Sequence, residues 1–177
     1  MTILPIVTVP DPVLKQRATE VGTVDDALRR QMDNMLDTMY DAPGIGLAAN
    51  QIGLLNRVLV MDLSERADEG EDVKRNPIYM VNPEIIFKSE EPSEMEEGCL
   101  SIPGQYALVQ RPAIVRVKYL DYNGQGQEME ASGLLSHCVQ HEIDHLDGVL
   151  FIDHLSKLKR DMIMKKLAKL QKGQQVL

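Results

Sequence analysis

Two histidines four residues apart, with a glutamate directly after the first, constrain this chain more than any other feature. They lie in the segment QHEIDH at residues 140–145. Residues four apart on a helix share one face and lie about 6 Å from each other. The spacing therefore predicts a helix on which His141 and His145 bind one metal ion, with Glu142 beside it to move protons. The alternative is that His141 is a hydrogen-bonded core residue and the five-residue pattern arose by chance.

A metal site needs a further ligand, and the sequence offers two candidates. His137 lies one turn before His141, but His137 to His145 spans about 12 Å along a helix axis, so three successive turns cannot converge on one ion. We therefore expect His137 in a pocket or in the core. Cys99 follows Gly98 in a stretch that is expected to be a strand. Taken alone, Cys99 is equally well interpreted as a buried thiol or as a metal ligand.

Length and composition place the chain among ordinary globular proteins. Its 177 residues predict one domain, 1–177, with 44% hydrophobic and 26% charged residues. It has no apolar run of about 18 residues, so we expect no membrane-spanning segment and no membrane partner. The first residues lack a signal or transit pattern, and two cysteines are too few for a disulfide framework. These features predict a cytoplasmic protein. Nothing in the sequence indicates DNA as a partner.

The charge is distributed unevenly along the chain. Residues 156–172 contain seven basic side chains and one acid, a net +6, which leaves −14 for the rest of a chain whose total is −8. A basic segment on an acidic body indicates an electrostatic partner such as RNA. The alternative is a solvated helix that packs through an apolar stripe. That stripe would consist of Leu158, Met162, Leu167 and Leu170.

Hydrophobic periodicity predicts the order of helices and strands. A first helix is expected from a cap at Thr23 to Pro43, with apolar residues at helical spacing between them. Strands are expected over 58–63, 78–87 and 114–120, with a loop over 64–77 and a hairpin turn at Asn123-Gly124. Further helices are expected over 134–146 and 156–172. The order predicts an α+β fold with mainly antiparallel sheet, an N-terminal helix and a C-terminal helix.

A glycine-rich segment over residues 44–53 adds a third motif. Its small residues allow close backbone approach to a ligand, and Gln51 offers an amide donor. This segment reads G-x-G-x-A-A-x-Q, the stretch at 97–101 reads E-G-C-x-S, and the helix reads Q-H-E-x-D-H. In this order the three motifs resemble those of the peptide deformylase family, and the match is complete at each. The resemblance extends to Pro103 and over Leu146 to Phe151, and it implies antiparallel sheets around a central metal-binding helix.

The resemblance also implies a reaction. One divalent metal would be held by Cys99, His141 and His145 with water as fourth ligand, most often Fe(II), with nickel, cobalt or zinc as substitutes. The substrate would be the N-formylmethionyl end of nascent polypeptides, which is hydrolysed to formate and a free N-terminal methionine. Glu142 would be the general base. Gln51 and the backbone N–H of Leu100 would hold the oxyanion.

Substrate contacts follow from the same resemblance. The backbones of Ile45, Gly46 and Gly98 would pair with the extended peptide. The methionine pocket would be lined by four residues, Met95, Leu134, His137 and Cys138. His137 occupies a place that is usually apolar in the family, and Tyr106 stands where some members have a basic residue. These two differences concern the shape of the pocket and the preference beyond methionine.

Two further expectations concern residues outside the reaction. Asp144 is expected to point inward, away from the face of the helix that carries the histidines, where a buried carboxylate needs a cationic partner. That partner is expected to be Arg111, chosen from its family position. The alternative is that Asp144 is solvated. The basic C-terminal helix is expected to bind the ribosome, as in some relatives with a similar helix.

Two other functions are compatible with parts of the pattern. A zinc endopeptidase would share H-E-x-x-H, but its third ligand usually lies downstream of the helix, whereas Cys99 lies upstream. A non-catalytic metal-binding or RNA-binding module would fit the basic segment. Such a module has no need of a base at Glu142 or an oxyanion donor at Gln51.

Overall fold

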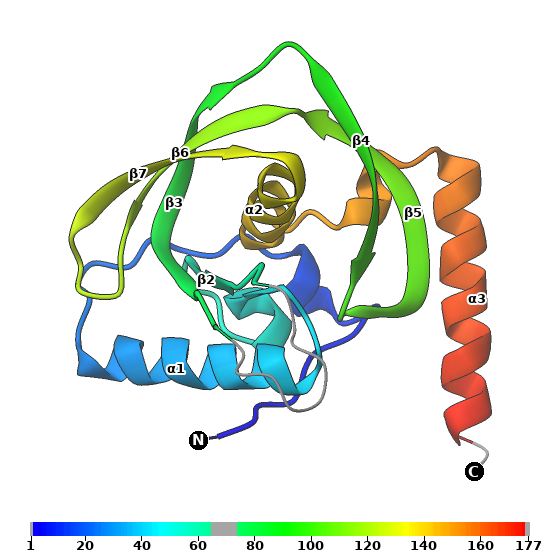
Figure 1. Ribbon diagram of the computed structural model, residues 1–177. Helices are drawn as coiled ribbons and strands as arrows, with labels where there is room; N and C mark the ends of the chain where they lie inside the picture. Colours follow the sequence, from blue (N-terminus) through cyan, green and yellow to red (C-terminus); the bar gives the residue numbers. More distant parts are fainter. Residues whose placement is uncertain (1, 65–73, 176–177) are drawn as a thin grey trace.

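Two antiparallel sheets surround one central helix in this computed structural model, which describes residues 2–64 and 74–175 (Figure 1). The five-stranded sheet has the order β1-β2-β3-β6-β7, and the two-stranded sheet pairs β4 with β5. The strands are β1 (Gly46–Ala48), β2 (Val58–Met61), β3 (Ile78–Lys88), β4 (Pro92–Cys99), β5 (Ile102–Pro112), β6 (Ile114–Leu120) and β7 (Gly126–Ser132). The central helix is α2 (Gly133–Leu146). The expected α+β class with mainly antiparallel sheet around a central helix is confirmed.

The two sheets are joined by an arch above α2. β3 runs into β4 and β5 runs into β6, so that the same two chain segments contribute to both sheets (Figure 1). Two backbone hydrogen bonds hold the arch, from Ser89 N to the Ile114 carbonyl and from Ala113 N to the Glu91 carbonyl, each 2.8 Å long. The arch brings β4 to the side of α2 opposite the larger sheet, where its last residues face the helix.

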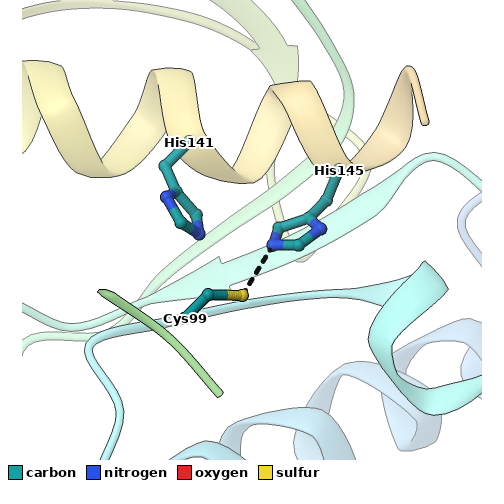
Figure 2. Close-up of side chains that lie close together, drawn as sticks. All are labelled: Cys99, His141 and His145. Atoms are coloured by element: carbon teal, nitrogen blue, oxygen red, sulfur yellow. Dashed lines mark hydrogen bonds between the residues drawn. The ribbon is translucent and has the colours of Figure 1, made fainter. Parts of the chain in front are cut away.

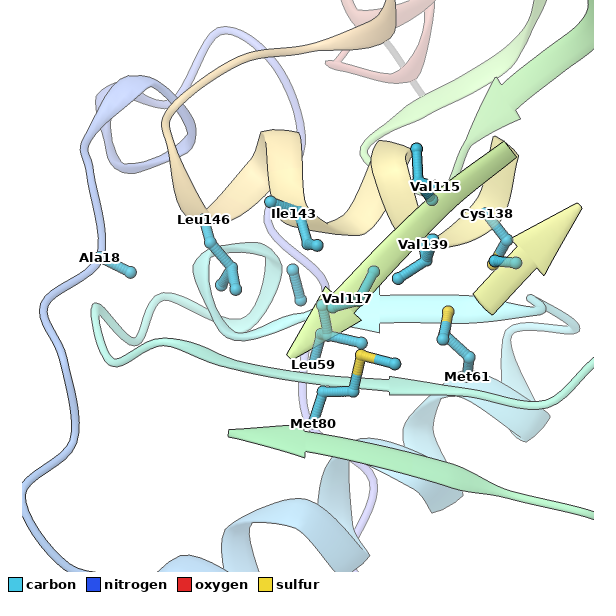
Figure 3. Close-up of a cluster of buried hydrophobic side chains, with 12 residues drawn as sticks. Ala18, Leu59, Met61, Met80, Val115, Val117, Cys138, Val139, Ile143 and Leu146 are labelled. Atoms are coloured by element: carbon cyan, nitrogen blue, oxygen red, sulfur yellow. The ribbon is translucent and has the colours of Figure 1, made fainter. Parts of the chain in front are cut away.

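α2 is buried on almost every side because sheet residues pack around it. Its Cys138, Val139, Ile143 and Leu146 contact strand residues that include Leu59, Met80 and Val117 (Figure 3). On β6, Val115 and Val117 face this core while Arg116 and Lys118 face solvent, the alternation expected of a half-buried strand. A helix buried all round has a fixed rotation and position. The side chains that it carries are therefore held rigidly.

The N-terminal helix α1 (Asp26–Asp41) lies against the other face of the larger sheet. Its Leu28, Met32, Met35, Leu36 and Met39 are buried, as the spacing predicted. The predicted cap at Thr23 was wrong. The helix begins at Asp26, so Asp25 is the residue whose side chain accepts from the first turn, at 2.9 Å from Leu28 N.

The C-terminal helix α3 (Lys157–Gln175) lies on the outside of β5 (Figure 1). The expected stripe was largely wrong, because Leu158, Met162 and Leu170 are exposed. Ile163 and Leu167, one turn apart, are buried against the body, and Met164 packs beside them. Three short 3-10 helices, η1 (Pro12–Lys15), η2 (Ala49–Ile52) and η3 (Phe151–His154), complete the described elements.

The remaining expectations are met at most positions. β6 has the predicted bounds, and β6 and β7 pair across the predicted turn at Asn123-Gly124. The expected strands over 58–63 and 78–87 correspond to β2 and β3. Of the expected loop over 64–77, residues 65–73 lie outside the described residues. Within the described chain, no helix is both long and apolar enough to cross a bilayer.

Candidate metal centre

Cys99, His141 and His145 lie together between β4 and α2 (Figure 2). Their ligand atoms are all within 4.8 Å of one another, and Cys99 Sγ is 3.2 Å from His145 Nε2. The two imidazole rings have centroids 5.0 Å apart and meet edge to face, as residues four apart on one helix should. Both histidines are buried and Cys99 is half-buried. Soft sulfur and imidazole donors at this separation are suited to one divalent transition-metal ion.

The end of β4 orients the side chain of Cys99 toward α2. The pairing of β4 with β5 changes register between Gly98 and Cys99, which is the irregularity of a β-bulge. Such irregularities redirect side chains near functional sites. Gly98 also leaves room for the Tyr106 ring, since a Cβ at position 98 would lie 2.5 Å from a ring carbon. The glycine and the bulge together account for the position of Cys99 opposite α2.

The protonation of His141 is fixed by Glu97. Its Nδ1 lies 2.9 Å from Glu97 Oε1. Burial alone would raise the pKa of Glu97, but hydrogen bonds from His141 and Arg111 outweigh it and hold that pKa well below its usual range. An ionised carboxylate only accepts, so His141 Nδ1 must donate. His141 Nε2 is then available as a ligand atom, in the carboxylate–histidine arrangement common in metal sites.

The two histidines differ in their affinity for protons. Burial, then the positive charges of His141 and Arg111, lower the pKa of His145 well below its usual value, so its imidazole is neutral and ready to bind a metal. For His141, burial also opposes the charged form. Hydrogen bonds to Cys99 and Glu97 nevertheless hold its pKa well above the ordinary value. A metal that binds there must displace a proton from this part of the site.

Glu142 is buried beside the cluster with one oxygen available. Its Oε2 has no hydrogen-bond partner among the described residues, and its Oε1 is 3.9 Å from His141 Nε2. Burial raises the pKa of Glu142 to about 7, against the opposing influence of His141. A carboxyl group with a pKa close to neutral can both take and release a proton during a reaction. Glu142 is therefore the group beside the cluster that is best suited to move a proton.

Gln51 faces the same cluster from η2. Its Nε2 is 3.5 Å from Cys99 Sγ and 3.1 Å from Ser101 Oγ, and its Oε1 accepts from Ala48 N at 3.0 Å. The amide orientation is therefore set by hydrogen bonds at both ends. Gln51 Nε2 therefore donates both to Ser101 Oγ and to the cysteine of the cluster.

A cavity of about 430 Å³ opens next to the cluster. Its lining includes each of the seven residues predicted for substrate contact, together with Gln51, Leu100, Tyr106 and Glu142. Cys138 lies in its wall, and burial raises the pKa of this thiol well above the ordinary value, so it stays protonated. The structure thus brings together the residues of the three sequence motifs around one cavity.

Sequence comparisons with known proteins identify the family to which this chain belongs. A family model described as polypeptide deformylase matches residues 3–161. A peptide deformylase of Mesorhizobium japonicum is 59% identical over 172 residues, which is 97% of this chain and 95% of that protein. One from Rhizobium meliloti is 55% identical over 172 residues, with 97% and 96% covered. The chain belongs to the polypeptide deformylase family.

Solved structures of the family have the same fold. The crystal structure of peptide deformylase from Ehrlichia chaffeensis superimposes with a TM-score of 0.90 at 42% identity, covering 98% of this chain and 99% of that one. The same deformylase in complex with actinonin gives 0.88 at 44% identity, with 96% and 98% covered. The chain is thus similar to deformylases along nearly its whole length.

One residue that shapes the site, Glu97, belongs to the E-G-C-x-S motif, but no role was predicted for it from the sequence. It forms a buried, two-pronged ion pair with Arg111, with Nε–Oε2 at 2.7 Å and Nη2–Oε1 at 2.9 Å. Arg111 also meets Asp144, the partner expected for it, at 2.8 Å, and Asp144 accepts from His154 at 2.8 Å. The spacing along the strand gave no signal for Glu97, because the bulge between Gly98 and Cys99 interrupts the alternation of side chains between the two faces.

Proposed function

We propose that this deformylase-family enzyme hydrolyses the N-formyl group of formylmethionyl nascent polypeptides at the Cys99–His141–His145 site. The observation that carries the proposal is a Cys-His-His cluster with Glu142 and Gln51 beside it, next to a largely apolar cavity. Two of the core clusters share β1, β2 and β3, and α2 contacts strands of both sheets, so we also propose that residues 1–177 act as one domain.

Cys99, His141 and His145 would hold one divalent metal, and Fe(II) is the ion that we propose, with nickel, cobalt or zinc as substitutes. When bound, such an ion acts as a Lewis acid and lowers the pKa of a coordinated water. The donor set fits this use, because His145 is neutral and His141 Nε2 faces the cluster. Three protein ligands also leave a position for water, which distinguishes catalytic from structural sites.

Glu142 would move the protons. Its carboxylate would take one proton from the attacking water as the oxygen bonds to the formyl carbon, and it would deliver that proton to the α-nitrogen of methionine as the bond between this nitrogen and the formyl carbon breaks. The products are formate and a free N-terminal amine. A pKa raised to about 7 by burial suits a group that must accept and then donate. Gln51 Nε2 and the backbone N–H of Leu100 would donate to the developing oxyanion.

The peptide would bind between the two sheets. In the described chain β1 lies at the edge of the larger sheet, and β4 pairs only with β5, so each strand has one edge without a strand neighbour. An extended peptide could add to these edges through Ile45, Gly46 and Gly98, since β-strand addition reads backbone and not side chains. Met95, Leu134, His137 and Cys138 would enclose the methionine side chain. The sequence after methionine would then vary freely.

One assay tests the reaction. The protein is purified without oxygen, its metal content is measured, and formate release from formyl-Met-Ala-Ser is followed with casein as a parallel substrate. We expect formate from the peptide, one metal ion per chain and no casein cleavage. Casein cleavage without formate release would instead favour an endopeptidase.

Replacement of the base tests the role of Glu142. Glu142→Gln keeps the size of the side chain but removes the proton acceptor, so we expect the metal to remain and the rate to fall by about 10²- to 10⁴-fold. Metal content and formate release are measured on the same sample. A variant that retains more than about a tenth of the wild-type rate would show that another group is the base.

We further propose that the enzyme works in the cytoplasm at the ribosome, with α3 as its docking element. Six of the seven basic residues of this helix are exposed, and within the described chain none of the seven forms a salt bridge. Ile163 and Leu167 fix one face on the body, which leaves Leu158, Met162 and the lysines facing outward. Binding near the source of the substrate raises the rate of encounter.

A charge reversal tests the docking. The triple change Lys165→Glu, Lys166→Glu and Lys169→Glu should abolish co-sedimentation with ribosomes and leave hydrolysis of small peptides unchanged. Wild-type co-sedimentation should also weaken steeply with salt, because contacts to phosphates release counterions. If the triple variant still co-sediments, these lysines are only a solvated helix face.

A further inference from the structure

Glu97 accepts four hydrogen bonds, and one of them comes from the wall of the cavity. Arg111 donates to both carboxylate oxygens, and His141 donates to Oε1. The fourth partner is His137 Nδ1, at 2.9 Å from Oε2. An ionised carboxylate offers about four acceptor sites, so the four partners fill it. A carboxylate held from four directions has little freedom to rotate.

His137 is itself fixed at both ends of its ring. Its Nε2 lies 3.1 Å from Ser93 Oγ on β4, while its Nδ1 is bonded to Glu97, and the residue is 2% exposed. Both ring nitrogens are therefore hydrogen-bonded to protein, and the residue forms part of the cavity wall. Burial of an imidazole costs free energy unless its polar atoms are paired. An aliphatic side chain would form the same wall without this requirement.

We propose that His137 is a positioning residue, which through Glu97 fixes the metal ligand His141 and so couples the wall of the substrate cavity to the strength of metal binding. The inference rests on the proposed function for the metal site. The path is short: Ser93 Oγ to His137, His137 to Glu97 Oε2, and Glu97 Oε1 to His141 Nδ1. Among the described residues, His137 forms hydrogen bonds to Glu97 and Ser93, so its effect on the metal ligands is expected to pass through Glu97.

The partner of a ligating histidine contributes measurably to metal affinity. Changing such a partner typically costs 10- to 100-fold in affinity. His137 does not contact the metal ligand directly but acts on Glu97, the partner of that ligand. When His137 is replaced, Arg111 still holds Glu97. We therefore expect an effect at the lower end of this range.

The test compares two substitutions at position 137. Nickel-loaded wild type, His137→Leu and His137→Gln are mixed with excess chelator, and the rate of metal loss is followed by the absorbance of the chelate. His137→Leu fills the wall but cannot donate to Glu97, so we expect metal loss about 10-fold faster than in wild type. His137→Gln keeps an N–H donor, and we expect metal loss within about threefold of wild type.

A purely structural role for His137 would give a different pattern. It would change the KM for formyl-Met-Ala-Ser and leave metal loss from His137→Leu within about twofold of wild type, which would overturn the proposal. Equal, fast metal loss from His137→Leu and His137→Gln would also overturn it, because the donated hydrogen bond would then be irrelevant.

A second variant keeps the test decisive if His137→Leu does not fold. Ser93→Ala frees Nε2 of the imidazole and leaves the cavity wall intact, so we expect metal loss about threefold faster. Unchanged metal loss from Ser93→Ala would count against the coupling. Failure of wild type to release formate, with the expected order of metal loss, would overturn the proposed reaction and leave this inference standing.

Discussion

At the scale of single residues, the site depends on polar groups whose orientation is fixed by their neighbours. Gln51 illustrates this, because Ala48 N donates to its Oε1 and Ser101 Oγ accepts from its Nε2. Ser101 is fully buried. Without that hydroxyl, the amide would lose one of its three hydrogen bonds, and the N–H proposed for the oxyanion would be less well oriented.

We therefore expect Ser101→Ala to lower kcat by about 10-fold with little change in KM. Removal of an oxyanion donor lowers the rate by about 10²- to 10³-fold, whereas here Gln51 Nε2 remains and only its orientation becomes less fixed. Steady-state kinetics on formyl-Met-Ala-Ser measure both constants. Ser132→Ala is the matched control, since Ser132 is exposed and its side chain makes no capping hydrogen bond. A fall in kcat as large in Ser132→Ala would mean that the effect is not specific to Gln51.

The residues found from the sequence are those whose spacing carries a geometric rule. His141 and His145 follow from the helical repeat, and Cys99 and Gln51 came from motifs. Glu97 and the bonding of His137 did not follow. Their roles depend on which strand of a second sheet lies against α2, and no periodicity within one segment contains that information.

At the scale of elements, the site depends on how closely β1 approaches α2. Gly46 of β1 lies against Glu142, and a Cβ built at position 46 would be 2.8 Å from Glu142 Oε1 and 2.9 Å from its carboxyl carbon. Only a glycine allows the strand and the helix to come this close. The approach also excludes water from one side of the Glu142 carboxylate, in keeping with its raised pKa.

Gly46→Ala should displace the Glu142 carboxylate while leaving the three metal ligands in place. We expect the rate of formate release to fall by about 10²-fold, since a shift of about 1 Å in a reacting group has an effect of this size. Metal content should stay at the wild-type level. Gly126→Ala is the control, because its Cβ would meet nothing within 4 Å. Full activity in Gly46→Ala would show that Glu142 is not held by β1.

Helices and strands were predicted correctly from the sequence where the segment has a single clear hydrophobic periodicity. β6 alternates cleanly, and α1 and α2 have strong helical spacing, so their existence and type were correct. The packing face of α3 was assigned wrongly because its sequence has apolar residues on two sides. Only contact with β5 and η3 decides that Ile163 and Leu167 are the buried pair.

At the scale of the whole molecule, hydrogen bonds between distant segments hold the catalytic loops together. Val7 N donates to the Gln51 carbonyl at 2.7 Å, and Val9 N donates to the Ser101 carbonyl at 2.9 Å. The N-terminal segment therefore links the turn that carries Gln51 to the turn that follows Cys99. The end of α2 is held in the same way, since Arg57 Nη1 and Ala18 N both donate to the Leu146 carbonyl.

Asp62 makes one such long-range contact sensitive to acid. It follows β2 and accepts from the Tyr40 hydroxyl of α1, from the backbone N–H and hydroxyl of Ser64, and from the backbone N–H of Asn76. Burial alone would raise the pKa of Asp62, but the hydrogen bonds from Ser64 and Tyr40 outweigh it and lower that pKa below its ordinary value. The folded state therefore binds this proton less tightly than the unfolded state does.

A pKa that is lower in the folded state stabilises the fold at pH values above about 4, and this stabilisation is lost as the pH falls through the folded-state pKa. We expect Asp62→Asn to be less stable than wild type by about 2 kcal/mol at pH 7, because the variant loses charge-assisted hydrogen bonds. The difference should shrink as the pH falls below about 4, where wild type is itself protonated. Urea unfolding of both proteins, followed by circular dichroism at each pH, measures it. A difference that stays constant down to about pH 3 would mean that Asp62 stabilises the fold through packing and not through its charge.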